Sequence, residues 1–81
     1  MAYNTVRKRT ADSLMKLYET YAGEQKKVTL EVSRADLAGM VGTATESVIR
    51  ILSEFKKDQW IEINGSSISI LEPEKIRAVK F

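Results

Sequence analysis

A glutamate and an arginine four residues apart carry the most specific chemistry in this sequence. Glu46 and Arg50 lie in a segment, residues 44–57, whose pattern predicts a helix. Residues at this spacing project from one helix face. A carboxylate can accept a hydrogen bond from the amino group of cytosine, and a guanidinium can donate two to guanine O6 and N7. The pair could therefore read base edges in a nucleic-acid duplex.

Two other interpretations of these side chains are open. An exposed ion pair between Glu46 and Arg50, worth about 0.3–0.5 kcal/mol, would explain them without nucleic acid. Both roles can coexist, because the carboxylate can also orient the guanidinium. Ile49, beside Arg50, either packs at the edge of the core or contacts a thymine methyl group, and we favour the second.

Composition excludes several other kinds of chemistry. The 81 residues include no cysteine and no histidine, so thiolate zinc sites and Ser-His or Cys-His catalysis are absent. No cluster of titratable groups or nucleophile-base pair is visible, and we expect neither an enzyme nor a cofactor or metal site in this chain. No apolar run approaches the roughly 20 residues of a membrane span. With no secretory signal either, we expect a cytoplasmic, non-membrane protein.

The segment 33–57 is predicted to position Glu46 and Arg50. Ser33 is a good N-cap for a short helix, and Asp36 three residues later can complete a weak capping box. Gly42 ends that helix, since the turn of a helix-turn-helix demands a left-handed backbone. A second helix restarts at Thr43 or Ala44. The inward residues predicted for the short helix are Leu37, Ala38 and Val41.

The second helix has a single apolar stripe, formed by Val48, Ile51, Leu52 and Phe55. If that stripe faces the core, the helical wheel turns Thr45, Glu46, Ile49 and Arg50 largely outward. In a helix-turn-helix the second helix enters the DNA major groove and presents its N-terminal residues to the bases. With Gly42 in place, base reading is favoured over a plain ion pair.

The flanking elements complete a winged helix-turn-helix of the α+β class. An amphipathic helix over residues 4–21, ended by Gly23, precedes a short strand over residues 27–32. Asn64-Gly65 predicts the turn of a β-hairpin between residues 60–63 and 66–71, because both residues tolerate positive φ. Pro73 opens a short last helix that carries Ile76 and Val79. The first helix should bury Val6, Thr10, Leu14, Leu17 and Tyr21, flanked by Ala11 and Tyr18, and the strand Val28, Leu30 and Val32.

Two consecutive runs carry a family resemblance. They are Ser33-Arg34-x-Asp36-Leu37-Ala38-x-x-Val41-Gly42 and Thr43-Ala44-Thr45-Glu46-Ser47-Val48-Ile49-Arg50-x-Leu52. Together they resemble the DNA-binding domain of the cyclic-AMP receptor and fumarate-nitrate regulator transcription factors. The resemblance extends to the first helix and to the hairpin, and so covers most of the chain, which we take as one domain over residues 1–81.

The resemblance implies a bacterial regulator that binds palindromic promoter DNA as a homodimer and contacts RNA polymerase. By position it implies base reading by Glu46 and Arg50 and phosphate binding by Ser33 and Arg34. It also implies contacts to the DNA backbone by Thr43 and Ser47. Thr45 stands where the cyclic-AMP receptor subgroup carries an arginine, so the binding site of that subgroup does not transfer.

The sensor domain and dimerisation helix of that family would precede residue 1. We therefore expect this chain to be a C-terminal, mostly monomeric part of a longer regulator. It should bind a half-site weakly, not far from the 10⁻⁴–10⁻⁶ M of non-specific contacts.

The alternative function is a winged helix that binds a partner protein, such as an RNA polymerase subunit, without reading bases. The modest net charge of +2 supports it. The basic run of residues 7–9, and Lys56 and Lys57, are more often solvated helix faces than DNA contacts, although the run could flank a DNA backbone. Ser66 and Ser67 at the hairpin tip are ordinary turn residues that could also bind phosphate.

Overall fold

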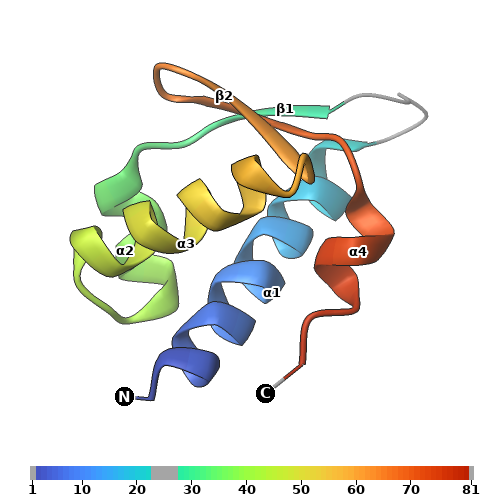
Figure 1. Ribbon diagram of the computed structural model, residues 1–81. Coiled ribbons are helices and arrows are strands. Elements are labelled where there is room, and N and C mark those ends of the chain that lie inside the picture. Colours follow the sequence, from blue (N-terminus) through green and yellow to red (C-terminus); the bar gives the residue numbers. More distant parts are fainter. Residues whose placement is uncertain (1, 23–27, 81) are drawn as a thin grey trace.

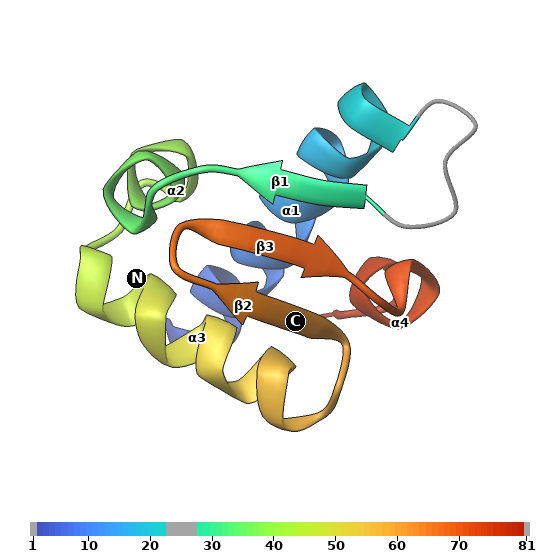
Figure 2. The ribbon, with the colours of Figure 1, turned by 90° about the horizontal axis from the view of Figure 1, so that it is seen from above.

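The computed structural model describes residues 2–22 and 28–80 and has the predicted order of elements (Figure 1). The helices are α1 (Tyr3–Ala22), α2 (Arg34–Val41), α3 (Thr45–Lys57) and α4 (Pro73–Arg77), and the strands are β1 (Val28–Glu31), β2 (Ile61–Asn64) and β3 (Ser67–Ile70). Figure 2 shows the strands over α1, with α2 and α3 on one side and α4 on the other. The helix-turn-helix (α2 and α3) and the wing (β2 and β3) are therefore held around one central helix.

The three strands form an antiparallel sheet in the order β1-β3-β2. The predicted position of the wing turn is wrong by one residue. Asn64 pairs with Ser67, so the two loop residues are Gly65 and Ser66, and of these only Gly65 has a positive φ, of 60°. The observed register sets Ile63 opposite Ile68, so apolar side chains meet across the strands. A loop at Asn64-Gly65 would have set Ile63 opposite Ser66.

The predicted apolar stripes form one core. The whole α3 stripe is buried to 1% exposure or less, and the predicted burial is confirmed for Leu37, Ala38 and Val41, for Val28 and Leu30, and for Ile76 and Val79. Val32, Leu17 and Tyr18 pack against this core while remaining partly buried. Gly23 and Lys27, assigned from sequence to a helix end and a strand start, lie outside the described residues.

Two assignments on α1 differ from the sequence prediction. Tyr21 is 61% exposed, although it lies on the helix face that was expected to be buried. It belongs to the last turn of α1, where the described part of the chain leaves its side chain largely in solvent. Met15 is buried at 5% exposure and was not predicted. Elements pack against α1 from several sides, which makes its buried face wider than one stripe.

No helix in the described part of the chain is both long and apolar enough to cross a membrane.

Candidate nucleic-acid interface

The start of α2 is fixed by a side-chain cap. Ser33 is the N-cap, and its Oγ accepts a hydrogen bond from the backbone N–H of Asp36 at 3.0 Å. The cap satisfies one of the amide groups that a helix N-terminus leaves without a partner. The capping box is only half formed, because within the described residues no bond returns from the Asp36 carboxylate to the Ser33 backbone. Ser33 is exposed, so its hydroxyl lies at the surface.

The turn between α2 and α3 depends on Gly42. Its backbone is left-handed, with φ 82° and ψ 39°, and its N–H donates to the Ala38 carbonyl at 2.8 Å. The N–H of Thr43 donates to the same carbonyl at 3.1 Å. Ala44 is then the N-cap of α3, without a side-chain cap bond. The predicted glycine turn is confirmed, and Ala44 is the boundary residue of the two considered.

The outward face of α3 carries the residues predicted to contact bases. Glu46, Ile49 and Arg50 are exposed, whereas Thr45 and Ser47 are half-buried. Ile49 is 47% exposed, which places it in solvent instead of in the core. The buried stripe on the opposite side fixes this orientation, since turning α3 would expose four large apolar side chains.

Glu46 and Arg50 form no ion pair with each other in the structure, although both are among the described residues. The guanidinium carbon of Arg50 instead lies 5.8 Å from the centre of the Tyr3 ring, at the start of α1. The structure therefore does not show the surface ion pair between Glu46 and Arg50 that was considered as an alternative to base reading.

Arg34, predicted to bind phosphate, links the helix-turn-helix to the wing. Its guanidinium donates to the carbonyl of Gly65, in the wing turn, at 2.9 Å. A guanidinium has five N–H donors, so this bond leaves others for a phosphate. Sequence patterns carried no signal for the contact, because it joins residues 31 positions apart.

The basic run near the N-terminus is engaged within the molecule. Arg7 forms an ion pair with Glu54 at 3.5 Å, and its guanidinium carbon lies over the rings of Phe55 and Trp60, at 5.2 and 5.7 Å from their centres. Lys8 pairs with Asp12 at 2.7 Å, and Arg9 donates to the Val41 carbonyl at 3.4 Å. These contacts favour a role for residues 7–9 in packing within the domain over a role in contacting the DNA backbone.

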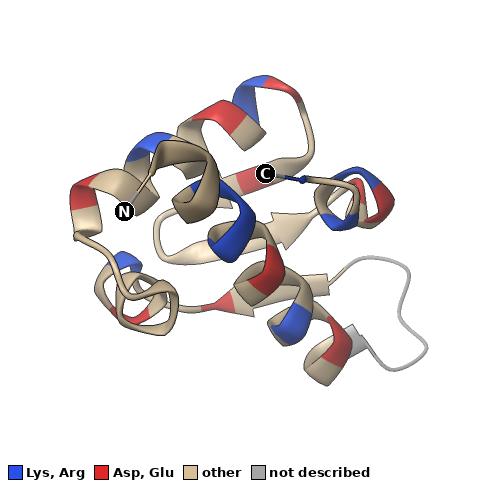
Figure 3. Cartoon of the chain, turned by 90° about the horizontal axis from the view of Figure 1, so that it is seen from below, with Lys and Arg blue, Asp and Glu red and all other residues tan. Residues whose placement is uncertain are grey.

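The remaining charges are spread over the molecule. Lys56 and Lys57 are exposed in the last turn of α3. In Figure 3 basic and acidic residues alternate along the helices, in keeping with the small net charge. Ser66 is exposed at the wing turn, and the Ser67 hydroxyl donates to the Glu31 carboxylate. In the described ranges, no three or more His, Cys, Asp and Glu side chains group as a possible metal site.

Most of this chain matches a known protein family. Residues 8–79 match the family model of the Crp-like helix-turn-helix domain. The chain belongs to that family. It is 28% identical over 79 residues to the CRP-like cAMP-activated global transcriptional regulator of Mycobacterium tuberculosis, with 94% of this chain and 35% of that protein covered.

Solved structures of Crp-family proteins share the fold. A CRP/FNR-family transcriptional regulator from Thermus thermophilus superposes with a TM-score of 0.80 at 27% identity, covering 90% of this chain and 39% of the other. The catabolite activator protein of the same organism gives a TM-score of 0.83 at 19% identity, covering 95% and 34%. The winged helix-turn-helix fold is thereby confirmed. The chain spans about a third of the length of these relatives.

Proposed function

We propose that this Crp-like domain is the DNA-binding output domain of a bacterial, cytoplasmic transcription regulator, with α3 inserted in the major groove. The observation that carries the proposal is the two-sided character of α3. One side is wholly buried, and the other presents Glu46, Ile49 and Arg50 to solvent in the first half of the helix. In helix-turn-helix proteins that half contacts the base edges.

The roles follow from the chemistry of each side chain. Arg50 donates to guanine O6 and N7, Glu46 accepts from a cytosine amino group, and Ile49 contacts a thymine methyl group. Thr45, half-buried at the start of α3, lies beside these residues. Around them, four residues hold the phosphate backbone: Ser33, Arg34, Thr43 and Ser47.

A second copy of the chain completes the site. We propose that the full-length regulator is a homodimer on a palindromic site and contacts RNA polymerase, and that this chain alone is mostly monomeric. A single domain then lacks the avidity of two linked half-sites and binds one half-site weakly.

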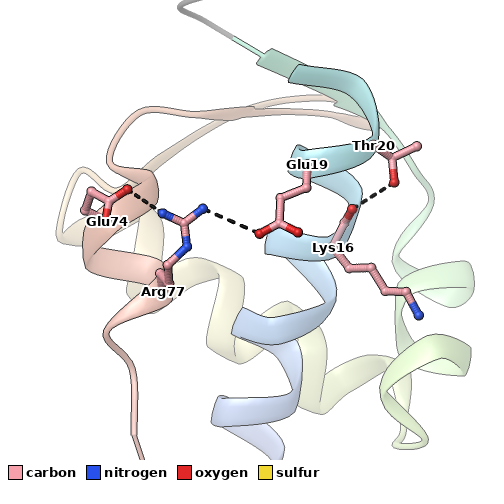
Figure 4. Close-up of polar contacts among 5 residues, drawn as sticks. All are labelled: Lys16, Glu19, Thr20, Glu74 and Arg77. Carbon is pink, nitrogen blue, oxygen red and sulfur yellow. Dashed lines mark hydrogen bonds and ion pairs between the residues drawn. The ribbon is translucent and has the colours of Figure 1, made fainter. Parts of the chain in front are cut away.

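The test is a selection from random duplex DNA with two copies of the chain joined by a flexible linker. We expect the selected sequences to contain an inverted repeat with a constant guanine. The preference of the protein for this guanine over other bases should fall about 5- to 150-fold in Arg50→Ala. The matched control is Arg77→Ala, which also removes one exposed positive charge. Arg77 lies on α4, where it pairs with Glu19 at 3.6 Å and with Glu74 (Figure 4).

The Arg77→Ala control should keep the preference for guanine. Its affinity for DNA should fall only by the small contribution of one positive charge far from α3. If a folded, linked dimer enriches no sequence, base reading is refuted. The alternative of a winged helix that binds a partner protein would then stand in its place.

A further inference from the structure

The side chain of Arg50 rests against a cluster built from α1 and α3. Tyr3 lies in the first turn of α1, and the centre of its ring is 5.8 Å from the Arg50 guanidinium carbon. Its hydroxyl group donates a hydrogen bond to the Glu54 carboxylate. Arg7, one turn further along α1, forms an ion pair with the same carboxylate at 3.5 Å. Tyr3, Arg50 and Glu54 line a shallow surface depression. Residues far apart in sequence thus meet beside the guanidinium.

We propose that Tyr3 is a positioning residue for Arg50, whose ring holds the guanidinium and leaves N–H donors free for a guanine. The inference rests on the proposed function, because it assigns a support to the residue that is to read the base. A guanidinium is planar, stacks on aromatic faces and directs its N–H donors from its edge. Stacking and base reading therefore use different parts of one group.

Glu54 is engaged by partners other than Arg50. It follows Arg50 by one helical turn, a spacing at which a carboxylate ordinarily pairs with an arginine. Here the carboxylate is already engaged by the Tyr3 hydroxyl and by Arg7. With Glu54 engaged, Arg50 contacts the ring and not the carboxylate.

The positioning contact should be modest in size. An exposed cation–π contact within about 6 Å of a ring centre corresponds to about a 2- to 5-fold change in an equilibrium constant. It acts by restricting a flexible arginine before binding, which lowers the ordering cost at the interface. The expected effect is a weaker preference for the guanine that Arg50 reads, with little change in binding to unrelated duplexes.

The experiment compares binding of the linked dimer to its selected site with binding to the same site carrying 7-deazaguanine, which lacks N7. The variants are Tyr3→Leu, which removes ring and hydroxyl, and Tyr3→Phe, which keeps the ring. Tyr3→Leu should lower the discrimination against 7-deazaguanine about 2- to 5-fold, and Tyr3→Phe should retain most of it. Tyr21→Leu is the matched control, because Tyr21 is an exposed tyrosine at the far end of the same helix.

NMR of the unbound chain tests the contact without DNA. The side-chain protons of Arg50 should move away from their ring-shifted positions in Tyr3→Leu but not in Tyr21→Leu. Unchanged Arg50 resonances, equal losses in Tyr3→Phe and Tyr3→Leu, or stronger discrimination in Tyr3→Leu would each overturn the positioning role. The last result would mean that the ring competes with the base.

Failure of the proposed function gives a different pattern. If Arg50→Ala itself leaves the discrimination against 7-deazaguanine unchanged, Arg50 does not read that base, and the role of Tyr3 falls with it. Loss in Arg50→Ala with no loss in Tyr3→Leu refutes only the positioning role.

Discussion

Two glycines three residues apart, Gly39 and Gly42, allow a sharp test of how the turn between α2 and α3 is stabilised. Gly42 has a left-handed backbone with φ 82°, whereas Gly39 lies within the helix α2. A Cβ at Gly42 would meet only the Arg9 guanidinium, at 3.7 Å, and one at Gly39 would meet nothing within 4 Å. Neither alanine substitution therefore creates a clash, and backbone conformation alone decides the effect.

The two substitutions should change stability in opposite directions. Gly42→Ala forces an L-residue into the left-handed region and should destabilise the domain by about 1–2 kcal/mol. Gly39→Ala removes a flexible residue from a helix interior and should stabilise it by about 0.5–1 kcal/mol. For a domain of this size each kcal/mol corresponds to about 4–8 °C in Tm.

Thermal and urea unfolding followed by circular dichroism at 222 nm measures both changes. Gly42→Asn should cost less than Gly42→Ala, because asparagine tolerates the left-handed region. If Gly42→Ala and Gly39→Ala shift the midpoint in the same direction, the backbone argument for this turn is wrong.

Four further predictions address the core, the caps and the phosphate contacts. Phe55→Ala should cost about 3–5 kcal/mol, measured by urea unfolding, because Phe55 is fully buried and packs on Trp60 at a ring separation of 5.3 Å. Ser33→Ala should destabilise the same transition by about 1 kcal/mol through loss of the cap, and should leave the slope of log K against log salt for DNA binding unchanged. Arg34→Ala should instead reduce that slope by about 1, and an unchanged slope would exclude a phosphate contact. Gln59→Gly should raise the melting temperature, because Gln59 has a φ of 64°; a lower value would refute strain at this position.

The ends of α2 and α3 show what the sequence could and could not predict. Gly42 marked the end of α2 because glycine favours the left-handed conformation found there. The end of α3 also has a left-handed residue, Gln59, one position after the C-cap Asp58, and no glycine signals it. The Gln59 N–H donates to the Lys56 carbonyl at 3.0 Å, and the Trp60 N–H to the Phe55 carbonyl at 2.9 Å. Local backbone bonds therefore close α3 through a residue that does not favour the left-handed conformation.

The wing turn shows a similar limit. Asn64-Gly65 is a strong local signal for a two-residue turn, and it located the hairpin correctly. The loop lies one residue further along the chain, and each β2 residue pairs two positions further along β3, because pairing Ile61 with Ile70 and Ile63 with Ile68 buries apolar surface across the sheet. A long-range gain in packing therefore outweighed the local preference.

The candidate site was predictable where it depends on helical periodicity. The buried stripe of α3 fixed which side chains point outward, so Glu46, Ile49 and Arg50 were placed on the exposed face from spacing alone. The partners of the arginines were not predictable. Arg34 meets the wing turn and Arg50 meets Tyr3, and both contacts join residues far apart in the chain.

The surface that binds DNA can be mapped directly by NMR titration of the isotope-labelled chain with its selected duplex. The proposed function predicts that the largest shifts fall on residues 45–50 at the start of α3 and on Ser33 and Arg34 at the start of α2. Smaller shifts are expected at the wing turn. Shifts centred on α4 around Arg77, with α3 unaffected, would contradict the central claim that α3 reads the DNA.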